Sequence, residues 1–181
     1  MATRPGMNNL IARVRWLLAD NDTPFIFPDE KIQEFLDSNR ADVRYLELDS
    51  IPTLIAGQNA LFLDFYSPIG GDWEEDEVLQ DGSFAVITPT TPDRLIGKWT
   101  FTTQPIYPIF VVGKRYDLNG AAADLLELWA SQLKLKFNFS TNQKKFDLQR
   151  QMQAVLEMAT TYRAKSWPKV QRMVRDDLAN Y

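Results

Sequence analysis

The chain of 181 residues contains no cysteine and no histidine. The lack of cysteine excludes a disulfide framework, a thiolate nucleophile and a cysteine-ligated zinc or iron–sulfur site. The lack of histidine excludes a Ser-His-Asp triad, a histidine general base and most transition-metal sites. Carboxylate, lysine, tyrosine and hydroxyl chemistry remain, with oxygen-ligated Mg²⁺ or Ca²⁺. We therefore expect a protein that is not an enzyme and that carries no cofactor and no metal.

Long apolar runs are also absent. No segment approaches the roughly 18 uncharged apolar residues that a membrane span requires, and residues 1–6 lack the apolar core of a signal peptide. Neither glycine pattern of phosphate loops, Gly-x-x-x-x-Gly-Lys-Ser/Thr or Gly-x-Gly-x-x-Gly, is present, so nucleotide hydrolysis has no support. We expect no membrane partner and use in a cytosol-like compartment.

Charge is distributed unevenly along the chain. The net charge is −4. Residues 1–40 contain 5 Lys or Arg and 6 Asp or Glu, residues 41–119 contain 5 Lys or Arg and 12 Asp or Glu, and residues 120–181 contain 10 Lys or Arg and 6 Asp or Glu. An acidic middle and a basic C-terminal part indicate two surfaces that face different partners. Chance variation between segments is the alternative.

The first 42 residues predict two helices. The first has Arg13 and Arg15 outside an apolar stripe that recurs every three or four residues. This stripe comprises Leu10, Ile11, Val14, Leu17 and Leu18. A second, short helix is expected to start at Pro28-Asp29, to be capped by Asp29 and to stop at Asn39.

Residues 43–113 change in character, because they hold six of the ten prolines and six of the eight glycines. Asp81-Gly82 predicts a two-residue hairpin turn. Pro105 and Pro108 indicate that the last strand lies at an edge or starts irregularly. The runs expected to form strands are Val43–Leu48, Leu61–Tyr66, Phe84–Thr88, Trp99–Thr103 and Ile106–Val112. These residues predict a small antiparallel β insertion.

Residues 114–166 predict two longer helices. Asp117 can cap the first, which continues to about Lys136, and Ser140 or Asn142 can cap the second, which Trp167-Pro168 breaks. Together with residues 1–42 they predict a mainly α fold, a helical bundle with a small antiparallel β insertion in residues 43–113. Residues 167–181 form a short amphipathic tail that is marginal as a lone helix and is expected to need a partner surface.

Two charged groups admit several interpretations. The acidic run Asp72–Glu77 is consistent with a solvated loop or with a surface for a basic partner. A cation site is the weaker alternative, because the run lacks the glycine and the closing glutamate of an EF-hand loop. The basic residues of the last forty positions could bind DNA phosphates or contact an acidic protein surface, or they could form the solvated side of helices. These residues are Lys144, Lys145, Arg150, Arg163, Lys165, Lys169, Arg172 and Arg175.

The stretch Gly113–Phe139 resembles the head–tail adaptor (connector) proteins of long-tailed bacteriophages. In that family a strand ending in glycine leads into Tyr-Asp, here Tyr116-Asp117, and then into an alanine-rich helix. A linker and a second long helix with a late Tyr-Arg, here Tyr162-Arg163, follow. The other matching segments are Val14-Arg15, Phe27–Asp29, Gly97–Phe101, Ala121–Glu127, Trp129-Ala130 and Phe137–Ser140.

The resemblance implies a siphophage virion protein that forms a ring, usually of twelve copies, beneath the portal at the head–tail interface. It implies assembly in the host cytoplasm and head completion as its role. The implied partners are the portal protein, neighbouring adaptor subunits and a stopper or tail-completion protein. Genome DNA would pass through the lumen without its sequence being read. The β insertion is longer than the family pattern requires, and it could reach neighbouring subunits, the capsid or the tail.

In that family the C-terminal tail engages the portal, a role that would fall here to residues 167–181. The residues expected at this interface are Trp167, Lys169, Val170, Arg172, Met173, Val174, Leu178 and Tyr181. Two rival functions remain open. One is a DNA-binding packaging accessory protein, based on the basic C-terminal residues, and the other is a carboxylate enzyme that uses Asp72–Glu77.

Overall fold

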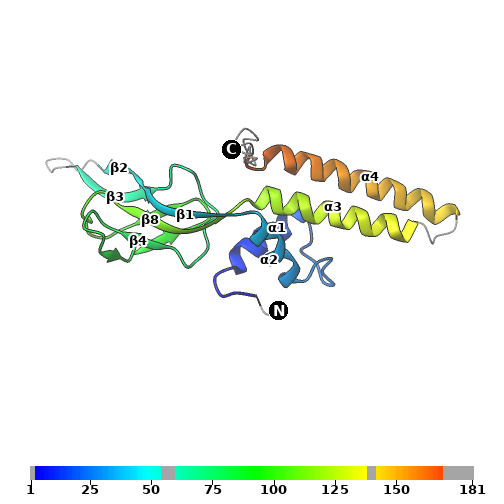
Figure 1. Ribbon diagram of the computed structural model, residues 1–181, viewed down its shortest axis with the longest axis horizontal. Helices are drawn as coiled ribbons and strands as arrows, with labels where there is room; N and C mark the ends of the chain where they lie inside the picture. Colours follow the sequence, from blue (N-terminus) through cyan, green and yellow to red (C-terminus); the bar gives the residue numbers. More distant parts are fainter. Residues whose placement is uncertain (1–2, 54–59, 138–141, 169–181) are drawn as a thin grey trace, which may run out of the picture.

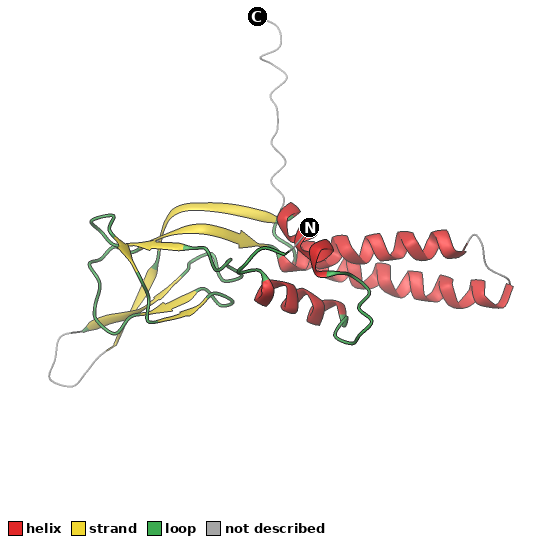
Figure 2. Cartoon of the chain, turned by 90° about the horizontal axis from the view of Figure 1, so that it is seen from below, coloured by secondary structure: helices red, strands yellow, loops and turns green. Residues whose placement is uncertain are grey.

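Figure 1 shows the computed structural model, which describes residues 3–53, 60–137 and 142–168. The molecule is elongated, with the strands at one end and the helices at the other (Figures 1 and 2). Helices α1 (Asn8–Leu18) and α2 (Asp29–Ser38) precede the strands, and α3 (Leu118–Phe137) and α4 (Asn142–Lys165) follow them. The helices that the apolar spacing predicts are therefore confirmed.

The strands form two four-stranded antiparallel sheets. In the first, the order is β1 (Arg40–Glu47), β8 (Phe110–Tyr116), β4 (Val78–Gln80) and β5 (Val86–Ile87). In the second, the order is β2 (Asp49–Thr53), β3 (Leu61–Tyr66), β7 (Lys98–Thr100) and β6 (Thr91–Asp93). Strand β1 follows α2 almost directly and β8 leads into α3, so the β part lies between the second and third helices in the chain.

The prediction of a mainly α helical bundle with a small β insertion is wrong. The chain is 39% helical and 25% strand, which makes it a mixed α/β fold with two antiparallel sheets. Four strands, β4 to β7, have only two or three residues each. The predicted runs overlap β1, β3, β5, β7 and β8, whereas β2 and β6 have no counterpart among them. Each of these two edge strands contains a proline, Pro52 and Pro92, which counts against a strand in the sequence, so the sequence pattern understated the β part.

Each part has its own hydrophobic core. The helical core contains Leu10, Ile11, Val14 and Leu18 of the predicted α1 stripe together with the small residues Ala121 and Ala122 of α3, all of which are buried, and the fifth stripe residue, Leu17, is partly buried against it. The sheet core lies between the two sheets and includes Trp73, Trp99 and Phe65. Within the described residues no helix is long and apolar enough to cross a membrane.

Several local predictions need correction. Arg15 does not lie outside α1 in solvent but is buried, where it donates hydrogen bonds to Asp20, Asp29 and the carbonyl of Phe27. Asp29 therefore does not cap α2, whose preceding residue is Pro28 and whose start has no side-chain cap.

The strand predictions for the first sheet also change in detail. The turn between β4 and β5 spans residues 81–85 rather than two residues, because Asp81 accepts hydrogen bonds from the N–H groups of Ser83 and Ala85. Strand β8 starts irregularly, at Phe110 after Pro108, but it is paired on both sides and is not an edge strand.

Candidate interaction site

The passage from β8 into α3 is the joint between the two parts of the molecule. The carboxylate of Asp117 accepts a hydrogen bond from the N–H of Gly120 at 2.9 Å, which confirms that Asp117 caps α3. The N–H of Asp117 donates to the carbonyl of Asn39 at 2.9 Å, at the end of α2. The joint is therefore held to the helix that precedes the sheets as well as to the helix that follows them.

Trp167, the first of the predicted portal-interface residues, lies at this joint. The backbone N–H of Trp167 donates a hydrogen bond to the second carboxylate oxygen of Asp117 at 2.7 Å. The guanidinium carbon of Arg115 lies 4.2 Å from the centre of the Trp167 indole ring, a cation–π contact. The Nε of Arg115 donates to the carbonyl of Gly71 at 2.8 Å, and burial lowers the pKa of Arg115 below its usual value.

The other predicted interface residues lie outside the residues that the structure describes. They are Lys169, Val170, Arg172, Met173, Val174, Leu178 and Tyr181. The structure thus places the start of the tail and says nothing of the tail itself.

The end of α4 is fixed by three further contacts. The hydroxyl of Tyr162 donates to the carbonyl of Leu17 in α1 at 2.7 Å. The guanidinium of Arg163 donates to Asp124 at 2.6 Å and to Glu127 at 2.8 Å, both on α3. The Tyr162-Arg163 pair of the family resemblance therefore connects α4 to α1 and α3 just before the chain reaches Trp167.

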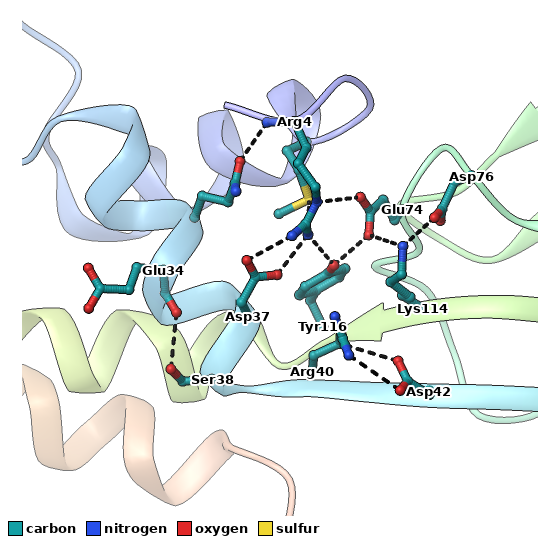
Figure 3. A network of polar contacts seen from close by, with 12 residues as sticks. Arg4, Glu34, Asp37, Ser38, Arg40, Asp42, Glu74, Asp76, Lys114 and Tyr116 are labelled. Carbon is teal, nitrogen blue, oxygen red and sulfur yellow. Dashed lines mark hydrogen bonds and ion pairs between the residues drawn. The ribbon is translucent and has the colours of Figure 1, made fainter. Parts of the chain in front are cut away.

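A polar network on the other side of the joint involves Arg4, a residue that the sequence did not mark (Figure 3). Its guanidinium binds the Asp37 carboxylate of α2 with two hydrogen bonds, of 2.7 and 2.9 Å. It also donates to Glu74 at 3.2 Å and to the hydroxyl of Tyr116 at 3.0 Å. One side chain thus connects α2 with the loop before β4 and with the end of β8.

Tyr116 and Lys114 complete this network from β8. The Tyr116 hydroxyl donates to Glu74 at 2.5 Å, and burial followed by this contact raises the pKa of Tyr116 above its usual value. The ammonium of Lys114 lies between Asp76 and Glu74, and these partners raise its pKa, the hydrogen bond to Asp76 having the largest effect. Glu74 is 2% exposed, so its charge is compensated almost entirely within the protein.

The acidic run Asp72–Glu77 is not one carboxylate cluster. Glu77 accepts hydrogen bonds from Arg94 at 2.8 Å and from the indole N–H of Trp99 at 3.1 Å, whereas Glu74 points to the joint. Glu75 is exposed and its carboxylate accepts a hydrogen bond from the side-chain amide of Asn9. No group of three or more acidic side chains in the described part of the chain is placed to hold a metal ion. The sequence missed these roles because the partners lie 17 to 70 residues away.

Comparison of the chain with family models, curated proteins and solved structures gives no match to any of them.

Proposed function

We propose that the protein is a head–tail adaptor of a tailed bacteriophage. It forms a ring beneath the portal, extends the DNA channel and joins the capsid to the next tail connector. The observation that carries the proposal is the placement of Trp167, which ties the first residue of the tail to Asp117 and Arg115 at the joint. A docking segment that starts from a fixed point loses less conformational freedom when it binds.

The structural role of the resembling stretch supports the same proposal. Gly113–Phe139 contains the end of β8, the cap at Asp117 and all of α3. The alanines at positions 121–123 are buried, and side chains of this size let neighbouring helices approach α3 closely. The residues that carry the resemblance thus build the joint from which the tail starts.

The proposed partners follow from this role. The tail of residues 167–181 engages the portal protein, and neighbouring subunits form the ring, of twelve copies as the resemblance implies. A stopper or tail-completion protein binds on the far side. DNA passes through the lumen without being read. The protein then acts at the head–tail interface of the virion, after assembly in the host cytoplasm.

Removal of Pro168–Tyr181 tests the proposal. We expect the truncated protein to keep its circular dichroism spectrum and thermal unfolding midpoint, because Trp167 and α4 remain. We expect it to lose binding to the portal protein of the same phage in a pull-down and in electron micrographs of portal complexes. Portal binding at undiminished affinity by the truncated protein would show that the tail is not the docking segment.

Point variants of the full-length chain separate the tail's apolar residues from its length. We expect Val170→Asp combined with Met173→Asp to abolish portal binding. The matched control, Gln171→Ala combined with Asn180→Ala, changes two polar residues of the same segment and should bind as the wild type does. Equal loss in both variants would contradict docking through the apolar side chains.

The rival function, a DNA-binding packaging accessory protein, gives a different result. It predicts DNA affinity that falls steeply with salt, since binding to phosphates releases counterions. One of the basic residues that suggested it, Arg163, is already paired with Asp124 and Glu127. Strong, salt-dependent DNA binding together with no portal binding would favour this rival.

A further inference from the structure

Strand β1 is a long, open edge of its sheet. It spans eight residues and pairs with β8 on one side, and no described strand pairs with its other side. The other three edges of the described sheets are protected, because β5 has only two residues and the edge strands β2 and β6 contain Pro52 and Pro92. Short strands and prolines keep an edge from pairing with another chain. Strand β1 contains no proline, so it is the edge at which a further strand can add.

Several backbone groups of β1 face this free edge. The N–H of Asp117 donates to the carbonyl of Asn39, and the N–H of Leu48 donates to the carbonyl of Ile109, so the chain at both ends of β1 is bonded to the chain at the ends of β8. In an antiparallel strand the N–H and C=O groups of successive residues point to opposite sides. Counting inward from each end, alternate residues therefore present their N–H and C=O groups to the free edge. These residues are Arg40, Asp42 and Glu47.

A bulge in the middle of β1 makes its two ends equivalent. The register with β8 shifts between Val43 and Leu46, which both pack against the sheet core. In a regular strand, Arg40 and Glu47 would lie on opposite faces, because an odd number of positions separates them. The extra residue of the bulge instead places both on the outer face of the sheet. Tyr45, in the bulge, has a φ of 51°, which side-chain-bearing residues rarely adopt, and such strain points to a function of the bulge.

The two ends of β1 carry opposite charges. Arg40 and Glu47 are both exposed. Arg40 forms an ion pair with Asp42 on the same strand (Figure 3), and a guanidinium has donors left for a second carboxylate. The carboxylate of Glu47 accepts a hydrogen bond from the exposed hydroxyl of Tyr107 and has lone pairs for further donors. A strand with a cation at its start and an anion at its end is complementary to an antiparallel copy of itself.

We infer that β1 of one copy pairs antiparallel with β1 of a second copy about a two-fold axis. Arg40 of each copy then lies opposite Glu47 of the other, and opposite charges across a strand pair are stabilising. The same register keeps outer-face residues opposite outer-face residues and inner opposite inner. The other pairs in this register are Ala41 with Leu46 and Asp42 with Tyr45. A two-fold contact closes after two copies, so it concerns the free protein and does not rest on the proposed function.

This register also joins the exposed aromatic surfaces of the two copies. Tyr45 is 59% exposed, and its ring meets that of Phe84 edge-on with centroids 6.2 Å apart. The ring of Phe84 stacks on that of Phe110 at 5.7 Å. Because the two-fold axis passes between residues 43 and 44, the Tyr45 rings of both copies lie close to it. Pairing therefore removes part of this apolar surface from water, which favours the contact.

Charge reversal in the full-length chain tests the contact and its register by sedimentation velocity. We expect the wild type to form dimers. Arg40→Glu alone and Glu47→Arg alone each place like charges opposite one another at both ends, and each should weaken dimerisation about tenfold or more. The double variant R40E/E47R restores both pairs with exchanged charges and should dimerise as the wild type does. A 1:1 mixture of the two single variants should form heterodimers of the same strength.

A proline tests the backbone pairing. The N–H of Asp42 faces the free edge, so Asp42→Pro keeps the hydrogen bonds to β8 and removes a donor to the second copy. We expect Asp42→Pro to lose dimerisation and Asp42→Ala to keep it. Glu157→Arg is the control for charge, because it makes the same change as E47R at an exposed residue of α4, and it should dimerise as the wild type does. Thermal unfolding followed by circular dichroism checks that each variant is folded, and the charge variants decide alone if Asp42→Pro is not.

A wild type that stays monomeric up to about 1 mM overturns the inference. So do single charge variants that associate as strongly as the wild type, or a double variant that stays monomeric. The tail is intact in all these variants, so portal binding is measured on them separately. A monomeric wild type that binds the portal rejects the β1 contact alone, whereas a dimeric wild type that does not bind the portal rejects the adaptor function alone.

Discussion

The hydroxyl of Tyr116 allows a direct test of whether the polar network holds the joint. Tyr116 is fully buried, and its hydroxyl donates to the nearly inaccessible carboxylate of Glu74 while accepting from Arg4. Tyr116→Phe removes this one oxygen and leaves the ring in place. Among the described residues, the Glu74 carboxylate then keeps Arg4 and Lys114 as partners, which are both partly exposed.

The expected cost follows from the charge of the acceptor. A hydrogen bond to a charged group contributes about 1.5–3 kcal/mol to stability, and a buried acceptor left with fewer partners adds to the loss. We therefore expect Tyr116→Phe to lower the free energy of unfolding by about 2 kcal/mol. For a chain of this size that corresponds to a fall in Tm of about 4–8 °C, measurable by circular dichroism or calorimetry.

Tyr107→Phe is the matched control. The Tyr107 hydroxyl donates to Glu47 at the same distance of 2.5 Å, but both groups are exposed. Water replaces that contact, so we expect no measurable change in Tm. If both variants lose the same stability, or if Tyr116→Phe loses none, burial does not give the Tyr116–Glu74 contact its strength and the reasoning is refuted.

Three other predictions follow. Because the pKa of Tyr116 is raised in the folded protein, its hydroxyl ionises just above pH 10 only in the unfolded state. The stability advantage of the wild type over Tyr116→Phe should therefore persist below pH 10 and shrink above it, as measured by urea unfolding at a series of pH values. Asp117→Ala removes the cap of α3 and the acceptor of Trp167 and should cost about 1–2 kcal/mol, whereas equal Tm values would contradict the capping role. Arg15→Met leaves Asp20 buried without its cation and should cost about 3 kcal/mol in the same assay. Arg44→Met, at an exposed arginine of β1, is the control and should leave Tm unchanged.

The sequence was informative where the pattern is long and local. The apolar stripe of α1, the cap at Asp117 and the strand Leu61–Tyr66 depend on neighbours within a few residues, and all three are confirmed. The edge strands β2 and β6 each contain a proline, and the register shift at Tyr45 depends on β8, a partner far along the chain. No local pattern predicts these features, and the β part was consequently expected to be smaller than it is.

Charged residues were the least predictable part of the site. Glu74 occurs in an acidic run that suggests a solvated surface, and Arg15 lies outside the predicted apolar stripe of α1, yet each is buried against partners that the fold brings to it. Arg4 reaches Glu74 across 70 positions of sequence. A single sequence contains no signal for such pairs, because charge alone does not reveal which carboxylate a guanidinium will meet.

The end of β8 connects the sheets to α2 and to the start of the tail. Because successive side chains of a strand point in opposite directions, Lys114 and Tyr116 face Glu74 and Arg4, while Arg115 faces Gly71 and the ring of Trp167. One side of the strand end fixes the sheets to α2, and the other side holds the start of the tail. A portal bound to the tail would therefore act on a segment whose first residue is already fixed relative to both the sheets and α2.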